Sequence, residues 1–200
     1  MRLLSFMKRR SLNRDDRGIA AVEFGLTAPV LLILTLGGLE FAHFVIAHHQ
    51  VRQIAAMTAD NASRLRTQMS EAYVNQLFVG VDKAGAGLKF KERGRAILSS
   101  IQNNNAGTGQ WIRWQRCFGQ LSRVSAFGPT DTGRNDDTLP TVDGLEAQAG
   151  SAIMMAEARY MYQPLFRNPF STEQEISHRI AFIVRQRSDF AISGTSPSTC

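Results

Sequence analysis

The longest apolar stretch of the chain lies near its N-terminus. A run of sixteen residues without a formal charge extends from Phe24 to Leu39, and apolar residues continue beyond Glu40. Read as one helix, residues 19–47 would be about 43 Å long, whereas the hydrocarbon core of a bilayer is about 30 Å thick. The pattern therefore predicts a transmembrane helix over residues 19–47, with Glu23 and Glu40 near its two boundaries.

Helical periodicity continues past this predicted span. Between residues 48 and 66, apolar or small side chains recur every three or four positions, at Val51, Ile54, Ala55, Thr58, Ala62 and Leu65. This spacing predicts an amphipathic extension of the helix over residues 48–66. An unbroken helix from residue 19 to residue 66 would form a stalk of 48 residues, about 72 Å long. A membrane helix followed by a separate core helix would give the same pattern, so periodicity leaves both arrangements open.

The remaining residues, 67–200, hold two helical and four extended patterns. The helical patterns cover residues 71–79 and 91–102, and the extended patterns cover residues 111–118, 121–127, 151–166 and 176–187. They are separated by a glycine-rich linker at 85–87, a turn cluster at 103–109 and a loop at 128–144. This content predicts one domain of the α+β class, with an antiparallel sheet of three or four strands and a flexible Ser-, Gly- and Pro-rich tail.

Two details of the strands follow from local sequence. Gly119 and Gln120 form a two-residue connection with glycine first, which predicts a type II′ hairpin between residues 111–118 and 121–127. Its register would place Arg116 opposite Arg123, an unfavourable pair. In the next strand alternate residues are small, apolar or aromatic and predict one buried face, made of Ala152, Met154, Ala156, Ala158, Tyr160 and Tyr162.

Positive charge is concentrated in the first eighteen residues. This leader, residues 1–18, has six basic side chains and two aspartates, so it carries +4 of the chain's net +6 and leaves +2 for residues 19–200. A basic flank before a membrane span favours a cytoplasmic N-terminus, with the rest of the chain on the other side. Because the remaining residues are close to neutral, they lack the concentrated basic face that binds nucleic acid, which argues against DNA or RNA as a partner.

Three interpretations of the N-terminal segment are compatible with these patterns. The segment is a signal peptide cut after residues 45–47, an uncleaved signal anchor, or a segment cleaved after Gly18. In the third case Ile19 becomes the first residue and Glu23 the fifth. The new amine of Ile19 and the carboxylate of Glu23 would then lie one helical turn apart. Each charge is costly in lipid, and an opposite charge on a neighbouring subunit would offset that cost.

The string that follows Gly18 resembles a known processing site. Gly18 followed by IAAVEF resembles the site in type IV prepilins, with Glu23 and Phe24 at the fifth and sixth mature positions. The longer string AAVEFGLTAPVLLILTLGGLEF is similar to the start of TadE-like proteins, the minor pseudopilins of the tight-adherence (Flp) pilus system. Gly25 and the pair Gly37–Gly38 depart from that pattern without disturbing the cleavage motif.

The resemblance implies a function, a location and partners. It implies a non-enzymatic pseudopilin that takes part in assembling an adhesive pilus and has a pilin-like shape. It places the chain in the bacterial inner membrane as a single-pass protein, with residues 67–200 in the periplasm, and leaves open whether it enters the filament. The implied partners are a prepilin peptidase, the major pilin, sister pseudopilins and the pilus secretion platform. The alternatives are a membrane-anchored periplasmic binding or scaffold protein unrelated to pili, and a periplasmic hydrolase.

The chain has two cysteines, Cys117 and Cys200. They are too few and too far apart for a zinc site built from CxxC motifs. In an exported domain, an even pair favours one intramolecular disulfide, and a thiol at an exposed terminus would otherwise be reactive. Two unrelated thiols are the alternative.

No residue pattern indicates catalysis. The sequence has no HExxH motif, nucleophile elbow, phosphate loop or dinucleotide-binding turn. We interpret His48 and His49 as polar residues at the membrane exit, and Asp136 and Asp137 as part of a solvated loop. We therefore expect no enzymatic activity, no cofactor and no metal site.

Overall fold

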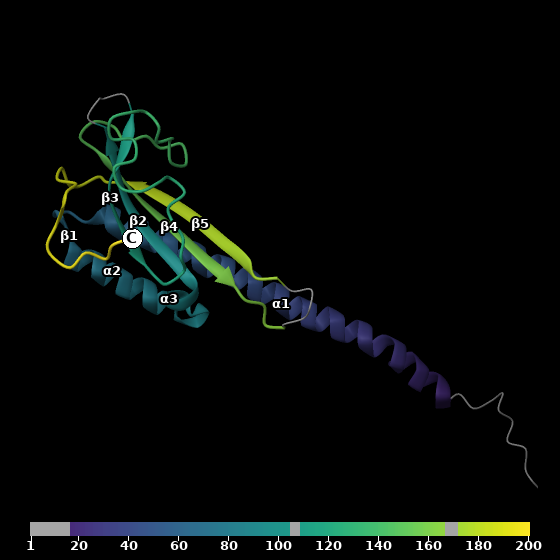
Figure 1. Cartoon of the computed structure of the whole chain (residues 1–200). Coiled ribbons are helices and arrows are strands. Elements are labelled where there is room, and N and C mark those ends of the chain that lie inside the picture. The colour runs from purple at the N-terminus through teal and green to yellow at the C-terminus, as the bar shows by residue number, and fades with distance from the viewer. Residues whose placement is uncertain (1–16, 105–108, 167–171) are drawn as a thin grey trace, which may run out of the picture. The chain divides into compact units, whose positions relative to one another are not determined.

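The computed structural model describes residues 17–104, 109–166 and 172–200, without the side chain of Arg17 (Figure 1). The chain divides into two compact units, residues 1–42 and 43–200. The predicted α+β class is confirmed, because a long apolar helix precedes a small antiparallel sheet with short helices. The elements are α1 (Arg17–Arg64), β1 (Met69–Ser70), α2 (Glu71–Ala84), the 3₁₀ turn η2 (Ala86–Leu88), α3 (Phe90–Arg93), β2 (Gly94–Asn103), β3 (Gln110–Phe118), β4 (Ala152–Tyr162), β5 (Gln174–Ile183) and β6 (Ile192–Ser193).

Helix α1 contains 48 residues and is not interrupted at Pro29. It begins and ends two residues before the predicted bounds of 19 and 66, and the alternative of two separate helices is not found. Of the predicted leader, residues 1–16 lie outside the described part of the chain.

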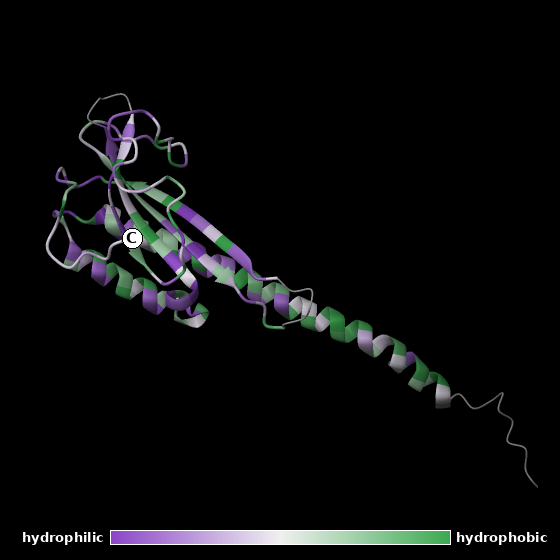
Figure 2. Cartoon of the chain, in the orientation of Figure 1, coloured by the Kyte–Doolittle hydropathy of each residue, from purple (hydrophilic) through white to green (hydrophobic). Residues whose placement is uncertain are grey.

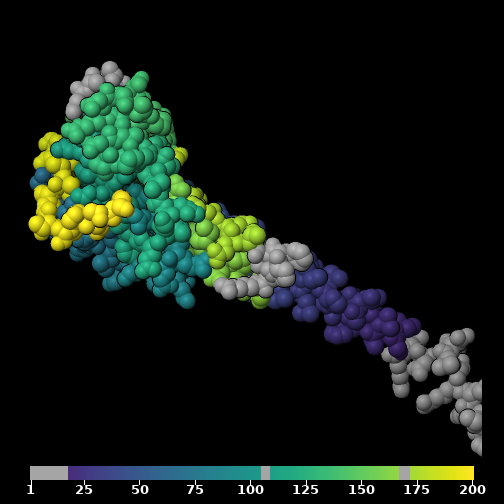
Figure 3. Space-filling model, in the orientation of Figure 1, coloured from purple at the N-terminus to yellow at the C-terminus, as the bar shows by residue number. Residues whose placement is uncertain are grey.

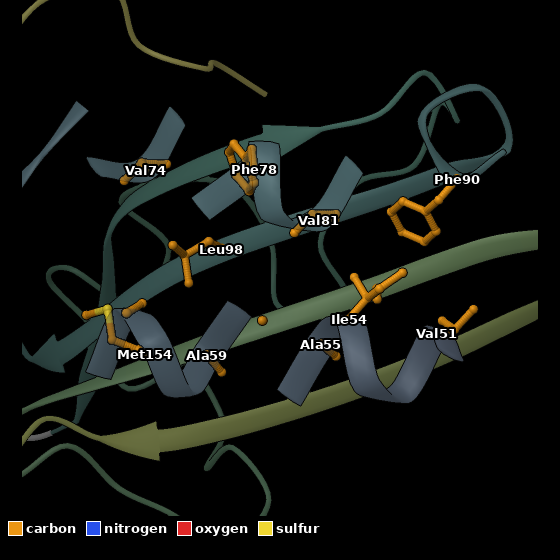
Figure 4. Packing of buried hydrophobic residues seen from close by; sticks show 14 of the residues in the cluster. Val51, Ile54, Ala55, Ala59, Val74, Phe78, Val81, Phe90, Leu98 and Met154 are labelled. Atoms are coloured by element: carbon orange, nitrogen blue, oxygen red, sulfur yellow. The ribbon is translucent and has the colours of Figure 1, made fainter. Parts of the chain in front are cut away.

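The predicted amphipathic stripe of α1 is buried in the core of the second unit. Leu65, the last predicted member, follows the helix and is only half-buried. The buried residues are the predicted Val51, Ile54, Ala55, Thr58 and Ala62, together with Ala47 and Ala59. Four of these seven side chains are alanines, and such small side chains let a helix approach its neighbours closely. Helix α2 adds Val74, Phe78 and Val81 to the same cluster, and the sheet adds Leu98 and Met154 (Figure 4). Burying one large aliphatic side chain of this kind contributes about 1.5–3 kcal/mol.

The main sheet has the strand order β3-β2-β4-β5, and all its neighbours are antiparallel. The predicted buried face of β4 is confirmed, because its alternate residues from Ala152 to Tyr162 pack in the cluster with α1 and α2. The opposite face is also buried, since Ile153 and Met155 pack against Leu139 and Val142 from the loop between β3 and β4. The central strands therefore separate two apolar clusters.

Two predictions from the sequence are wrong. Residues 91–102, predicted as a helix, form mainly strand β2. Residues 96–101 are buried on both faces of the sheet, so the sequence lacks the polar alternation that marks a half-exposed strand. Residues 121–127, predicted as a strand, form a loop, and β3 pairs with β2 instead. Gly119 has the expected positive φ of 98°, but the chain leaves the sheet there instead of forming the predicted hairpin.

Candidate processing and assembly site

The four predicted processing residues lie in the first two turns of α1. Gly18, Ile19, Val22, Glu23 and Leu26 share one face of this helix. Ile19 and Glu23 are separated by four residues and are therefore stacked along that face. Phe24 projects from another face, and 71% of its side chain is exposed. Residues 19–23 are therefore helical, as the predicted separation of one turn between the Ile19 amine and the Glu23 carboxylate requires.

Gly18 has no structural reason within the described chain to be glycine. A Cβ atom added at Gly18 would meet nothing within 4 Å, and the same holds for Gly25, Gly37 and Gly38. A glycine inside a helix costs about 1 kcal/mol relative to alanine. These glycines leave the helix backbone open to another molecule, as the predicted cleavage after Gly18 requires.

The first unit presents an apolar surface. Every residue from 18 to 42 is exposed except Ala28 and Glu40, which are half-buried, and Figure 2 shows mostly hydrophobic residues along this part of α1. By length and composition α1 is able to cross a membrane. Thr27 and Thr35 donate their hydroxyls to the carbonyls of Glu23 and Leu31, at 2.9 and 2.8 Å. These bonds satisfy polar groups that lipid would leave without partners.

In the second unit, Cys117 and Cys200 form a disulfide with 4.9 Å between their Cα atoms. The disulfide lies at the end of β3 and joins it to the last residue of the tail. The tail is also held by backbone bonds, since Cys117 N–H donates to the carbonyl of Ser198 at 2.9 Å and β6 pairs with β1 in parallel. Figure 3 shows the tail, in yellow, lying on the surface of the second unit.

A buried ion pair lies next to this disulfide in sequence. Arg116 of β3 donates its Nε–H to both carboxylate oxygens of Glu71, at 3.0 and 2.9 Å, and Nη2 also contacts Oε1. Glu71 is the first residue of α2, so the helix dipole also favours its negative charge. Arg123, which the predicted hairpin would place opposite Arg116, instead pairs with Glu175 of β5 at 2.8 Å. Both arginines therefore have carboxylate partners from elements distant in sequence.

A group of histidines, which the sequence did not bring together, lies where α1 meets β4 and β5. His43 Nδ1 is 2.9 Å from the hydroxyl of Tyr162, and His48 Nδ1 is 3.3 Å from His178 Nε2. Burial lowers the pKa of His178 below its ordinary value of 6.5, and the neighbouring His48 and Arg52 lower that pKa further. Within the described ranges, no group of three His, Cys, Asp or Glu side chains is arranged to hold a metal.

The spacing of apolar residues in the sequence places His48 on the buried side of α1. His48 follows Phe44 by four residues and precedes Val51 by three, so it continues the buried stripe toward the N-terminus.

Asp136 lies in a loop, as predicted, and accepts hydrogen bonds from the hydroxyl and N–H of Thr138 at 2.6 and 3.1 Å. These bonds lower the pKa of Asp136 and stabilise a local turn.

The exposed apolar helix and the domain that follows it define a class of protein, a single-pass membrane-anchored α+β protein. Residues 18–60 match the family model for TadE-like proteins, so the resemblance is confirmed for this segment. No curated protein and no solved structure matches the chain. The matched segment includes Gly18, Ile19, Glu23 and Phe24, together with most of the buried stripe of α1.

Proposed function

We propose that this chain is a pseudopilin that takes part in assembling an adhesive, tight-adherence pilus. The observation that carries the proposal is the TadE-like match over residues 18–60, which coincides with an exposed apolar helix whose first turns hold Gly18 and Glu23. In this function a prepilin peptidase cuts after Gly18, and the helix then packs against the major pilin and sister pseudopilins near the secretion platform.

The proposed location follows from charge and from the cysteines. The basic leader keeps the N-terminus in the cytoplasm of a bacterium, and residues 67–200 then lie in the periplasm. The periplasm is oxidising, which suits the bond between Cys117 and Cys200. Cell adhesion would be the outcome of the assembled pilus and not an activity of this chain alone.

Analysis of the mature N-terminus tests the proposal. The chain is expressed with a C-terminal tag in a bacterium that carries the tight-adherence machinery, and the mass of the membrane-bound form is measured. We expect the wild type to begin at Ile19 and Gly18→Leu to remain uncut, because the peptidase must approach the backbone at this point. Gly25→Leu is the matched control, since a Cβ meets equally open space at that position and processing should continue.

A wild-type protein that retains Met1 in this membrane fraction would contradict the proposal. It would favour an uncleaved, membrane-anchored binding or scaffold protein unrelated to pili. Loss of processing in both glycine variants would show that added bulk in the helix is responsible, and not the cleavage position.

A further inference from the structure

A hollow of about 510 Å³ lies in the second unit, at the C-terminal end of α1 and the end of β5. Its lining is formed by Asp60, Ser63, Arg64, Arg66, Phe182, Ile183, Arg185 and Gln186. The volume lies within the range of about 300–1,000 Å³ that is usual for ligand sites. We call it the arginine hollow, because arginine is its most frequent lining residue.

Positive charge dominates this lining, with three guanidinium groups and one carboxylate. Arg64 donates its Nε–H to Asp60 at 2.8 Å, and Arg66 donates its Nε–H to Gln186 at 2.7 Å. Arg185 makes no hydrogen bond or ion pair with any residue in the described ranges. Guanidinium Nη groups therefore remain available on all three arginines, and their planar forks match the two oxygens of a carboxylate.

The walls of the hollow are fixed to each other by a buried arginine. Arg187 follows the lining residues Arg185 and Gln186 and donates its Nη1–H to the carbonyl of Ala62 at 2.9 Å. This bond joins the segment after β5 to the last turns of α1. A ligand would therefore meet arginines whose backbone positions are already set, which reduces the entropy lost on binding.

The hollow also offers apolar contacts and an unpaired strand edge. Phe182 and Ile183 are 39% and 42% exposed, although both are large apolar side chains. They end β5, which is the edge strand of the sheet and pairs with β4. Among the described residues, the outer backbone groups of β5 make no hydrogen bond. Such an edge accepts an extended peptide through main-chain hydrogen bonds.

We propose that the arginine hollow binds an acidic peptide segment of a partner protein. Carboxylates of the segment contact Arg64, Arg66 and Arg185, and an adjacent apolar side chain packs on Phe182 and Ile183. Charge complementarity selects an acidic partner, and the strand edge selects a peptide over an acidic polysaccharide. A second copy of this chain is a poorer match, because its residues 19–200 carry a net charge of +2.

The position along α1 argues against a lipid headgroup as the anion. From His43 to Arg64 the helix rises about 32 Å at about 1.5 Å per residue, and the apolar span precedes His43. The exclusion of a lipid headgroup depends on the membrane anchoring that forms part of the proposed function. The binding proposal otherwise stands on the second unit alone.

Fluorescence anisotropy with the full chain in lipid nanodiscs tests the proposal. The probe is a fluorescein-labelled eight-residue peptide that alternates Glu and Val. We expect Arg185→Gln to weaken binding about threefold or more, and the triple variant Arg64→Gln, Arg66→Gln, Arg185→Gln to weaken it more than about thirtyfold. Arg134→Gln is the matched control and should bind normally, because Arg134 is also an exposed arginine with one ion pair to an aspartate.

Equal binding by the wild type and the triple variant would overturn the proposal. Equal binding of an all-Glu peptide would overturn the apolar contact with Phe182 and Ile183. Equal binding of a polyuronate would overturn the peptide assignment and indicate a general polyanion surface. Thermal unfolding of the triple variant controls for its folding. If the triple variant is unfolded, binding by the single variant Arg185→Gln tests the proposal instead, and unchanged binding would overturn it. This change should not disturb folding, since Arg185 has no partner among the described residues to lose. The purified protein is used, so the result is independent of cleavage at Gly18.

Discussion

Ile33 and Ile54 lie in the same helix, yet the first residue is 71% exposed and the second only 1%. In the first unit, apolar residues occur all around the helix, so no face is selected for packing within the chain. In the second unit, apolar residues form one stripe that the sheet and α2 cover. The two halves of this helix therefore have different surroundings. Changes in the first half should alter insertion and assembly, and changes in the second half should alter folding.

The largest expected effect is on assembly, from Glu23→Ala. Removing a carboxylate from lipid leaves insertion unchanged or easier, and the stability of the second unit should not change. If Glu23 pairs with the Ile19 amine of a neighbour, the loss leaves that amine unpaired, and pilus formation should fall at least about tenfold. Pili counted by electron microscopy and crosslinking to sister pilins provide the measurement.

Glu23→Asp, which keeps the charge, is the control for this prediction and should retain most of the assembly. Normal piliation in the alanine variant would show that the carboxylate does not pair. It would also weaken the contrast between the two halves of α1, because a polar residue in the exposed half would then have no role outside the chain.

The disulfide should give the second-largest effect, confined to the second unit. It closes a separation of 83 residues, for which the chain-entropy model predicts at most about 4.5 kcal/mol. Cys117→Ser with Cys200→Ser should lower the free energy of unfolding toward this limit, measured in denaturant through the fluorescence of the buried Trp114. Non-reducing peptide mapping of the wild-type protein should find the two cysteine peptides joined. Recovery of both as free thiols would contradict the expected bond.

A matched pair of isoleucine substitutions tests the comparison directly. Ile54→Ala removes a buried side chain next to α2 and the sheet, so the second unit should lose about 3 kcal/mol of unfolding free energy. Ile33→Ala makes the same chemical change in the exposed half and should stay within about 0.5 kcal/mol. Equal losses in the two variants, measured by urea unfolding in the same detergent, would contradict the division of α1 into two kinds of surface.

The smallest expected effect is a dependence of stability on pH. The pKa of His178 is lowered in the folded state, so the unfolded chain binds this proton more readily. The contribution of His178 to the free energy of unfolding is therefore fully present above about pH 6.5, and it is lost as the pH falls toward the folded pKa. Protonation also places a second positive charge near Arg52.

Melting temperatures between pH 7.5 and 5.5 provide the measurement. His178→Gln should reduce the pH slope, whereas His49→Gln should not, because His49 is exposed. An unchanged slope in His178→Gln would assign the dependence to other groups.

The elements predicted correctly from the sequence are those with a visible periodicity of apolar and polar residues. The stripe of α1 is periodic because only one side of the helix meets a core, and β4 alternates because Glu157 and Arg159 lie on its second face. Strand β2 is also covered on both sides, but its run of small and apolar residues lacks this alternation and is compatible with a helix or a strand. The false hairpin had the correct glycine, but local turn chemistry does not specify which strand pairs with β3.

The candidate sites also differ in how far the sequence alone reveals them. Gly18, Ile19 and Glu23 are neighbours in sequence, so their spacing on a helix is readable from the chain alone. The arginine hollow joins residues 60–66 to residues 182–186, and no local pattern signals that the end of α1 meets the end of β5. The same holds for the contact between His48 and His178, which are 130 residues apart.

The bond between Cys117 and Cys200 also changes how the chain transmits mechanical force. Strands β4, β5 and β6 all lie between the two cysteines, inside a covalently closed segment. Tension applied at the two ends of the oxidised chain passes from Cys200 directly to Cys117, so the enclosed strands lie outside the load-bearing path. About 290 Å of contour length, at about 3.5 Å per residue over a separation of 83 residues, becomes available for extension only after reduction.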